Sequence, residues 1–227
     1  MSNSLRRVAL MTLPECTPLK IVDWGKLDYE KSLQRQVAHV DRCMRGDADD
    51  TLVFVEHPRT VTLGRRATDD DLHFSAAIFQ ERGVCLQRIN RGGMATAHEP
   101  GQLVVYPLVS LKRKDVRWYC QQLLQTVVDL LADYSVVGCL KAGEPGVWVG
   151  GAKICSFGVA LKKWVSSHGI AINLNNDLVT FSMIVPCGRT DERITSLKEE
   201  LGKSVDIDEV KKRFVGHFCR NFGYRPF

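Results

Sequence analysis

The stretch QLVVYPLVSLKRKDVRWYCQQLLQTVVDLLADY, residues 102–134, contains both kinds of element from which we expect the chain to be built. Its first part, Gln102–Val109, is an apolar run rich in β-formers and predicts a strand. Its second part, Asp115–Tyr134, predicts a helix with Asp115 as the cap. The apolar stripe of this helix is Val116, Cys120, Leu123, Val127, Leu130 and Tyr134. A strand followed by a long amphipathic helix indicates helices packed on a sheet.

The same two patterns recur on both sides of this stretch. Helices are predicted over Asp28–Arg45 and Asp208–Phe222, each followed by a glycine that can end it. The residues expected to face inward are Tyr29, Leu33, Val37, Val40 and Met44 in the first, and Val210, Phe214 and Phe218 in the second. Strands are predicted over Thr51–Glu56, Thr60–Leu63, Val84–Ile89, Val147–Val149, Lys153–Leu161 and Gly169–Leu174. This alternation predicts an α/β (α+β) fold, and the length of 227 residues without a repeat or linker predicts one domain, 1–227.

The composition argues against several classes of protein. No apolar run reaches about 18 residues, so we expect no membrane span, and Val8–Leu13 is too weak for a secretory signal. We expect a cytoplasmic protein, with a mitochondrial location as the alternative. The formal charge of +5 favours acidic partners, but no Lys/Arg run with interleaved aromatics indicates nucleic-acid binding.

The cysteines predict reduced thiols and no metal site. They are Cys16, Cys43, Cys85, Cys120, Cys139, Cys155, Cys187 and Cys219. None forms a CxxC pair or a Cys/His cluster at zinc-ligand spacing, and most lie in apolar periodic segments.

Cys187 differs from the others because it lies between Pro186 and Gly188, after the apolar run Phe181–Val185. Proline fixes φ and glycine permits unusual φ values, so a cysteine between them is held on a sharp bend. This position fits a nucleophile, and it also fits a buried structural thiol.

Three further stretches carry candidate chemistry. Arg91–Gln102 begins with Arg-Gly-Gly and can bring backbone N–H groups close to a ligand, or it can be a flexible polar hairpin. Lys153 begins an apolar strand after a two-glycine turn, so it either points inward or protects an edge strand. His168 enters the strand of Ser167–Asn175 and, taken alone, is more typical of a structural histidine than of a base.

In this collinear order the motifs resemble the lipoyl(octanoyl) transferases, over nearly the whole chain. The resemblance rests on the Tyr29 helix, Glu56-His57-Pro58, Arg91–Gln102, Gly146–Ile154, His168–Asn175, Pro186-Cys187-Gly188 and Ile194-Thr195-Ser196-Leu197. It implies a single mixed-sheet domain of the lipoate-ligase and biotin-ligase type. Similarity to the ligases themselves is looser, since Gly64-Arg65-Arg66 is only a fragment of their adenylate-forming signature.

The resemblance also implies an activity, which is transfer of an octanoyl group from octanoyl-acyl carrier protein to a lysine. The implied acceptors are apo-lipoyl domains of 2-oxoacid dehydrogenases and glycine cleavage H protein, with no ATP, cofactor or metal. The implied nucleophile is Cys187 and its partner is Lys153. The implied substrate-binding residues are Arg91, Gly92, Gly93, Met94, Ala95, Thr96, Ala97, His98, Ser156, Phe157, Gly158, Gly169, Ile170 and Ala171.

Two departures from the family pattern occur beside His98. Ala97 replaces an aromatic residue, which predicts a lost wall of the acyl site, and Glu99 replaces a glycine, which predicts an anion near the thiol unless Arg91 or Lys153 pairs with it. These departures keep two alternatives open, an amidotransferase between carrier domains and a non-catalytic homologue that binds acyl carriers. A papain-like protease pairing Cys187 with His168 is a further alternative that lacks its own signatures.

Overall fold

A computed structural model of the protein describes residues 17–185 and 192–227. The strands are β1 (Thr17–Lys26), β2 (Thr51–Glu56), β3 (Thr60–Leu63), β4 (Cys85–Arg88), β5 (Ala95–His98), β6 (Gln102–Leu108), β7 (Cys139–Lys141), β8 (Glu144–Val149), β9 (Ala152–Lys162), β10 (Val165–Asn173) and β11 (Tyr224–Pro226). The helices are α1 (Tyr29–Arg45), α2 (Ala76–Glu81), α3 (Val116–Ala132), α4 (Leu197–Leu201) and α5 (Ile207–Phe222), with 3-10 turns η1 (Asp69–Asp71) and η2 (Val179–Met183).

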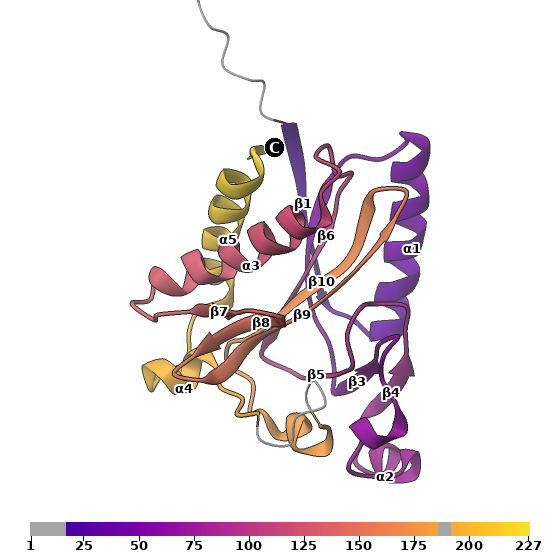
Figure 1. Cartoon of the computed structure of the whole chain (residues 1–227), viewed down its shortest axis with the longest axis vertical. Coiled ribbons are helices and arrows are strands. Elements are labelled where there is room, and N and C mark those ends of the chain that lie inside the picture. Colours follow the sequence, from indigo (N-terminus) through magenta and orange to yellow (C-terminus); the bar gives the residue numbers. More distant parts are fainter. Residues whose placement is uncertain (1–16, 186–191) are drawn as a thin grey trace, which may run out of the picture.

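The larger of two sheets has eight strands in the order β11-β1-β2-β6-β10-β9-β8-β7 (Figure 1). Strand β1 runs parallel to β2 and β11, whereas the other neighbours are antiparallel. The sheet is therefore mixed, as expected. Its long central hairpin, β9–β10, stays in register from the Lys162–Val165 pair to the Cys155–Ile172 pair.

Helices cover both faces of this sheet (Figure 1). On one face, Leu123 and Leu130 of α3 and Phe214 and Phe218 of α5 are fully buried in the main core. Asp115 caps α3 as predicted, because its side chain accepts from the backbone N–H of Trp118 at 3.0 Å. On the other face, α1 packs against β6 and β10. Among the helices of residues 17–185 and 192–227, none is long and apolar enough to cross a membrane.

The inward face of α1 differs from the sequence prediction. Val37 is 53% exposed, whereas Ser32 and Gln36 are fully buried. Gln36 faces inward because its side-chain oxygen accepts a hydrogen bond from the backbone N–H of His168 in β10 at 2.8 Å. A similar error affects α3, where Val116 is 42% exposed and Tyr119 is buried instead.

The smaller sheet has the strand order β4-β3-β5 and packs with α2 and η2 around a second core (Figure 1). Strands β2 and β3, expected on either side of a turn, thus belong to different sheets. Part of the expected loop Arg91–Gln102 is strand β5, paired with β3 from the Thr60–His98 pair to the Leu63–Ala95 pair. This pairing fixes which side chains of the segment face the candidate site.

Candidate active site

Two adjoining cavities lie between β5, the start of β8 and the β9–β10 hairpin. The outer cavity has a volume of about 210 Å³, and its lining residues are Arg66, Arg91, Gly93, Met94, Ala95, Thr96, Gly143, Glu144, Pro145, Lys153, Ser156 and Phe157. The inner one is a narrow space of about 20 Å³, lined by Tyr29, Arg91, Thr96, His98, Val104, Tyr106, Ser156, Phe157, Gly158, His168, Gly169, Ile170 and Ala171. The two share four lining residues and therefore form one continuous site, here called the acyl cavity.

Lys153 lies at the outer end of the acyl cavity and points inward. Its side chain is only 4% exposed, so the prediction of an inward lysine is confirmed and the edge-strand alternative is wrong. The ammonium is 3.2 Å from a carboxylate oxygen of Glu192, which is equally buried, and lies 5.1 Å from the ring centroid of Trp148. Trp148 Nε1 donates to the other oxygen of Glu192 at 3.2 Å. A buried lysine with such partners is a candidate functional group.

The chain that follows residues 186–191 is bound to the backbone of Lys153. The Lys153 N–H donates to the carbonyl of Arg193 at 2.7 Å, and its carbonyl accepts from the Thr195 N–H at 3.0 Å. Cys187 itself, the predicted nucleophile, lies outside the described residues. Glu192 was not predicted, because nothing in the sequence indicates that this polar segment meets β9.

Arg91 joins the two parts of the acyl cavity and is 5% exposed. One guanidinium nitrogen donates to the backbone and hydroxyl oxygens of Thr62, each at 2.8 Å, and the other to the carbonyl of Gly92 at 3.0 Å. Gly158 allows this approach, since a Cβ there would lie 2.8 Å from Cδ of Arg91. The guanidinium thus fixes the loop to β3 while lining the cavity.

Aromatic and histidine side chains surround the inner end of the cavity. Tyr106 OH is 2.8 Å from Nε2 of His57, and Tyr29 OH is 3.4 Å from Nδ1 of His168. Burial lowers the pKa of both His57 and His168 to about 4 and holds the pKa of His98 well below its usual range. These rings are therefore uncharged at neutral pH, which suits contact with an apolar ligand.

The predicted substrate-binding residues converge on this cavity, with two exceptions. Gly92 lines neither part, and its N–H donates to the carbonyl of Val159 at 3.1 Å, which makes it unsuitable as a free oxyanion donor. Ala97 lines neither part because its side chain is fully buried in the core of the smaller sheet. Eight residues of the cavity lining were not predicted, although Tyr29 and His168 among them lie in motifs that carry the resemblance. They are Tyr29, Val104, Tyr106 and His168 in the inner part and Arg66, Gly143, Glu144 and Pro145 in the outer part.

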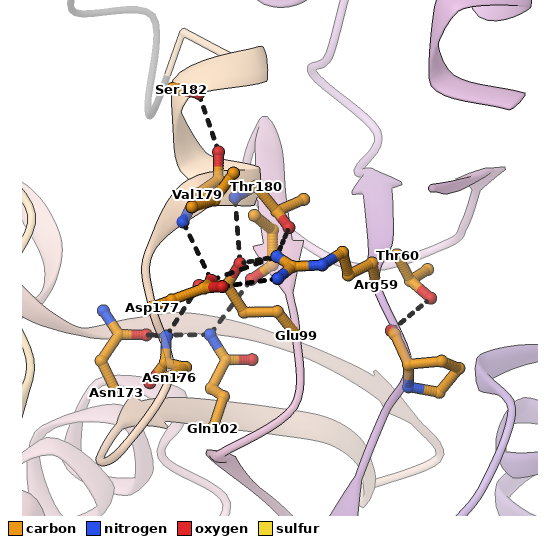
Figure 2. Close-up of polar contacts among 12 residues, drawn as sticks. Arg59, Thr60, Glu99, Gln102, Asn173, Asn176, Asp177, Val179, Thr180 and Ser182 are labelled. Atoms are coloured by element: carbon orange, nitrogen blue, oxygen red, sulfur yellow. Dashed lines mark hydrogen bonds and ion pairs between the residues drawn. The ribbon is translucent and has the colours of Figure 1, made fainter. Parts of the chain in front are cut away.

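Glu99 lines neither part of the acyl cavity, contrary to expectation. Figure 2 shows the polar contacts that it makes instead, among them those with Arg59 and Asn176. Its cation is Arg59 rather than Arg91 or Lys153, with Nη1 of Arg59 2.9 Å from the carboxylate. The carboxylate also accepts from the side chain of Asn176 at 3.0 Å and the N–H of Thr180 at 2.9 Å. Arg59 further binds Asp177, which lowers the pKa of that carboxyl. Glu99 therefore links Asn176 and Thr180, at the start of η2, to Arg59, the residue before β3, and does not place an anion in the cavity lining.

Glu99→Ala is expected to destabilise the fold by about 3–5 kcal/mol. The substitution removes a fully buried carboxylate, so the cation and the donors that bind it lose their acceptor. Denaturant unfolding measures this change. Asp177→Asn is the matched control and should have a much smaller effect, since Asp177 is 53% exposed. Equal stability of Glu99→Ala and the wild type would contradict the structural role.

An aromatic residue in place of Ala97 would overpack the core of the smaller sheet, because Ala97 is fully buried there, and would not add a wall to the acyl cavity.

The fold is that of lipoate and biotin ligases. Lipoate-protein ligase A bound with ATP superposes with a TM-score of 0.71 at 19% identity, over 93% of this chain and 89% of that structure. Biotin protein ligase from Aquifex aeolicus gives a TM-score of 0.55 at 18% identity, over 90% of this chain and 68% of that structure. The expected fold type is therefore confirmed.

Residues 28–219 match the family described as lipoyl protein ligase A/B catalytic domain, and the chain belongs to that family. Within it, the octanoyltransferase of Chloroflexus aurantiacus is 44% identical over 209 residues, which are 89% of this chain and 93% of that protein. The family and the fold together overturn the papain-like protease as an interpretation.

Proposed function

We propose that the chain transfers an octanoyl group to a lysine of lipoyl domains and takes it from octanoyl-acyl carrier protein. The observation that carries the proposal is a cavity large enough for an acyl chain, with a buried lysine in its lining. Its named relatives are octanoyltransferases, which supports the same activity.

The volume of the outer cavity fits an eight-carbon chain. An apolar cavity of about 150 Å³ holds benzene, which corresponds to roughly 25 Å³ for each carbon. The outer cavity, about 210 Å³, therefore has room for about eight carbons.

In the proposed first step, the Cys187 thiolate attacks the carbonyl carbon of the donor thioester. A new C–S bond forms, the old C–S bond breaks, and the donor sulfur leaves with a proton from the Lys153 ammonium. The ammonium form of Lys153 also favours the thiolate before attack. A thioester is already activated, so the step needs no ATP.

In the second step, the acceptor lysine attacks the carbonyl carbon of the Cys187 thioester. A C–N bond forms, the C–S bond breaks, and Cys187 leaves as a thiolate. Neutral Lys153 takes the proton that the attacking amine loses, which restores its ammonium form. Over the two steps, a thioester and an amine are converted into a thiol and an amide, and Lys153 carries the proton from the amine to the donor sulfur.

Acceptors are proposed to be apo-lipoyl domains of 2-oxoacid dehydrogenases and glycine cleavage H protein. The net charge of +5 favours encounter with acidic carrier proteins. Bacterial relatives favour the cytoplasm as the compartment, with the mitochondrion as the alternative.

The test mixes the purified chain with octanoyl-acyl carrier protein and an apo-lipoyl domain, without ATP. The acceptor should gain the mass of one octanoyl group on its lysine. A parallel reaction replaces octanoyl-acyl carrier protein with an octanoylated carrier domain as the donor. Transfer only in that second reaction would show the amidotransferase, and binding of both carriers without transfer would show a non-catalytic homologue. Either result overturns the proposal.

Glu192 is proposed to hold the Lys153 side chain in position for this proton transfer. Glu192→Gln keeps the shape and an oxygen for Trp148 but removes the charge. We expect kcat to fall by about tenfold, on the scale of a misplaced catalytic group, with little change in KM.

Glu192→Asp, which keeps the charge, is the matched control and should restore most of the wild-type kcat. A kcat that is unchanged in Glu192→Gln, or equally low in Glu192→Asp and Glu192→Gln, would show that the charge of Glu192 does not assist the transfer.

A further inference from the structure

His168 stands between the acyl cavity and a second hollow that the proposed reaction does not use. This hollow, here called the α1 groove, lies between α1 and the β9–β10 hairpin and has a volume of about 450 Å³. Its apolar lining includes Leu33, Val37 and Val40 of α1 and Ala160 and Leu161 of β9. Of the residues that line it, His168 also lines the inner part of the acyl cavity.

The three spaces follow one another along strand β9. Lys153 lines the outer cavity, Ser156 and Phe157 line both parts of the acyl cavity, and Gly158 lines the inner part. Ala160 and Leu161, the next cavity-lining residues of β9, face the α1 groove. His168 pairs with Val159, between these two sets of residues. A chain that enters at Lys153 and runs along β9 therefore meets the His168 side chain before it can reach the groove.

The His168 side chain is held firmly in this place. Its backbone has φ +56°, a conformation that side chains other than glycine adopt rarely and only where the surroundings enforce it. The backbone N–H donates to Gln36, and ring Nδ1 is 3.4 Å from the Tyr29 hydroxyl. The residue is 4% exposed, and burial keeps the ring uncharged. Such a side chain is a fixed wall against which the end of an apolar chain can rest.

We infer that His168 sets the upper limit of acyl chain length in this enzyme, by separating the acyl cavity from the α1 groove. The inference rests on the proposed octanoyl transfer. At roughly 25 Å³ for each carbon, a twelve-carbon chain needs about 300 Å³. The acyl cavity does not offer this volume, but the groove beyond His168 does.

The experiment compares octanoyl- and dodecanoyl-acyl carrier protein as donors for the wild type and for His168→Gly. Glycine removes the wall and suits the positive φ. We expect the ratio of kcat/KM for dodecanoyl to that for octanoyl to rise by at least about tenfold, because the added methylenes gain apolar contact. Refilling the groove in His168→Gly/Ala160→Phe should return the ratio to the wild-type value.

The outcomes separate this inference from the function on which it rests. A wild type that transfers no octanoyl group overturns the proposed function. A wild type that transfers octanoyl, together with an unchanged ratio in folded His168→Gly, overturns the inference alone. A dodecanoyl gain that persists after Ala160→Phe overturns it as well, since the gain then does not come from the groove. If circular dichroism shows that His168→Gly is unfolded, His168→Asn gives the same decision, because asparagine is smaller and tolerates positive φ.

Discussion

Replacing Cys187 with serine is expected to reduce octanoyl transfer to a lipoyl domain by about a thousandfold or more, with the fold intact. A serine hydroxyl is a much weaker nucleophile than a thiolate and cannot form the thioester on which the second step depends. The measurement is single-turnover transfer from octanoyl-acyl carrier protein, followed by the mass of the acceptor. Thermal unfolding of Cys187→Ser beside the wild type checks the fold.

Cys155→Ala is the matched control for this substitution. Cys155 is fully buried two residues from Lys153, and burial raises the pKa of its thiol to about 12, so it stays protonated. Its replacement should lower stability by about 1–3 kcal/mol and leave transfer unchanged. Near-normal turnover by Cys187→Ser, or loss of chemistry in folded Cys155→Ala, would contradict the assignment of the nucleophile.

Replacing Lys153 with methionine is expected to slow transfer by about a hundredfold or more, the usual contribution of a proton-transferring group. It should also move the alkylation of Cys187 to higher pH. A nearby cation lowers the pKa of a thiol, so its removal raises that pKa, and the reactive thiolate then appears only at higher pH. Iodoacetamide modification, followed by mass spectrometry across the pH range, measures the shift.

The alkylation assay needs a background in which Cys187 dominates the signal. Cys85 and Cys139 are exposed, and Cys16 lies outside the described residues, so serine should replace all three. Lys153→Arg is the control, since it should keep the alkylation at low pH but fail to restore transfer, because arginine does not release its proton at neutral pH. An alkylation profile in Lys153→Met identical to the wild type would exclude the pairing of Lys153 with Cys187.

The elements with strong periodicity were predictable from the sequence. In α5, Val210, Phe214 and Phe218 are all fully buried, and Gly223 ends the helix at φ +74°. Apolar side chains that are four residues apart lie on the same side of a helix, so the side that faces the core can be identified from the sequence. The strands at Lys153–Leu161 and Gly169–Leu174 were also predicted and lie within β9 and β10, whereas the mixed sheet was expected from the family resemblance.

The prediction failed where tertiary polar contacts decide the structure. The buried face of α1 includes Ser32 and Gln36, because Gln36 accepts a hydrogen bond from β10. The spacing of apolar residues along the helix does not reveal a polar contact of this kind. Strand β5 was interpreted as a loop because it is only four residues long and follows Gly92 and Gly93. Neither feature indicates that it pairs with β3.

The candidate site was predicted largely through the resemblance, and the structure corrects its details. The alternation of β5 turns Thr96 and His98 toward the acyl cavity and Ala97 toward the small core. The Glu99–Arg59 and Lys153–Glu192 pairs join residues that are 40 and 39 positions apart. Such pairs depend on the packing of distant segments, which one sequence without its fold does not reveal.

The most direct test of the acyl-enzyme mechanism is the mass of the intact protein after brief mixing with octanoyl-acyl carrier protein in the absence of an acceptor. We predict one octanoyl adduct, mapped by peptide analysis to Cys187, absent in Cys187→Ser and discharged when an apo-lipoyl domain is added. An unmodified protein that still octanoylates the lipoyl domain, or an adduct on another residue that is discharged at the same rate, would contradict it.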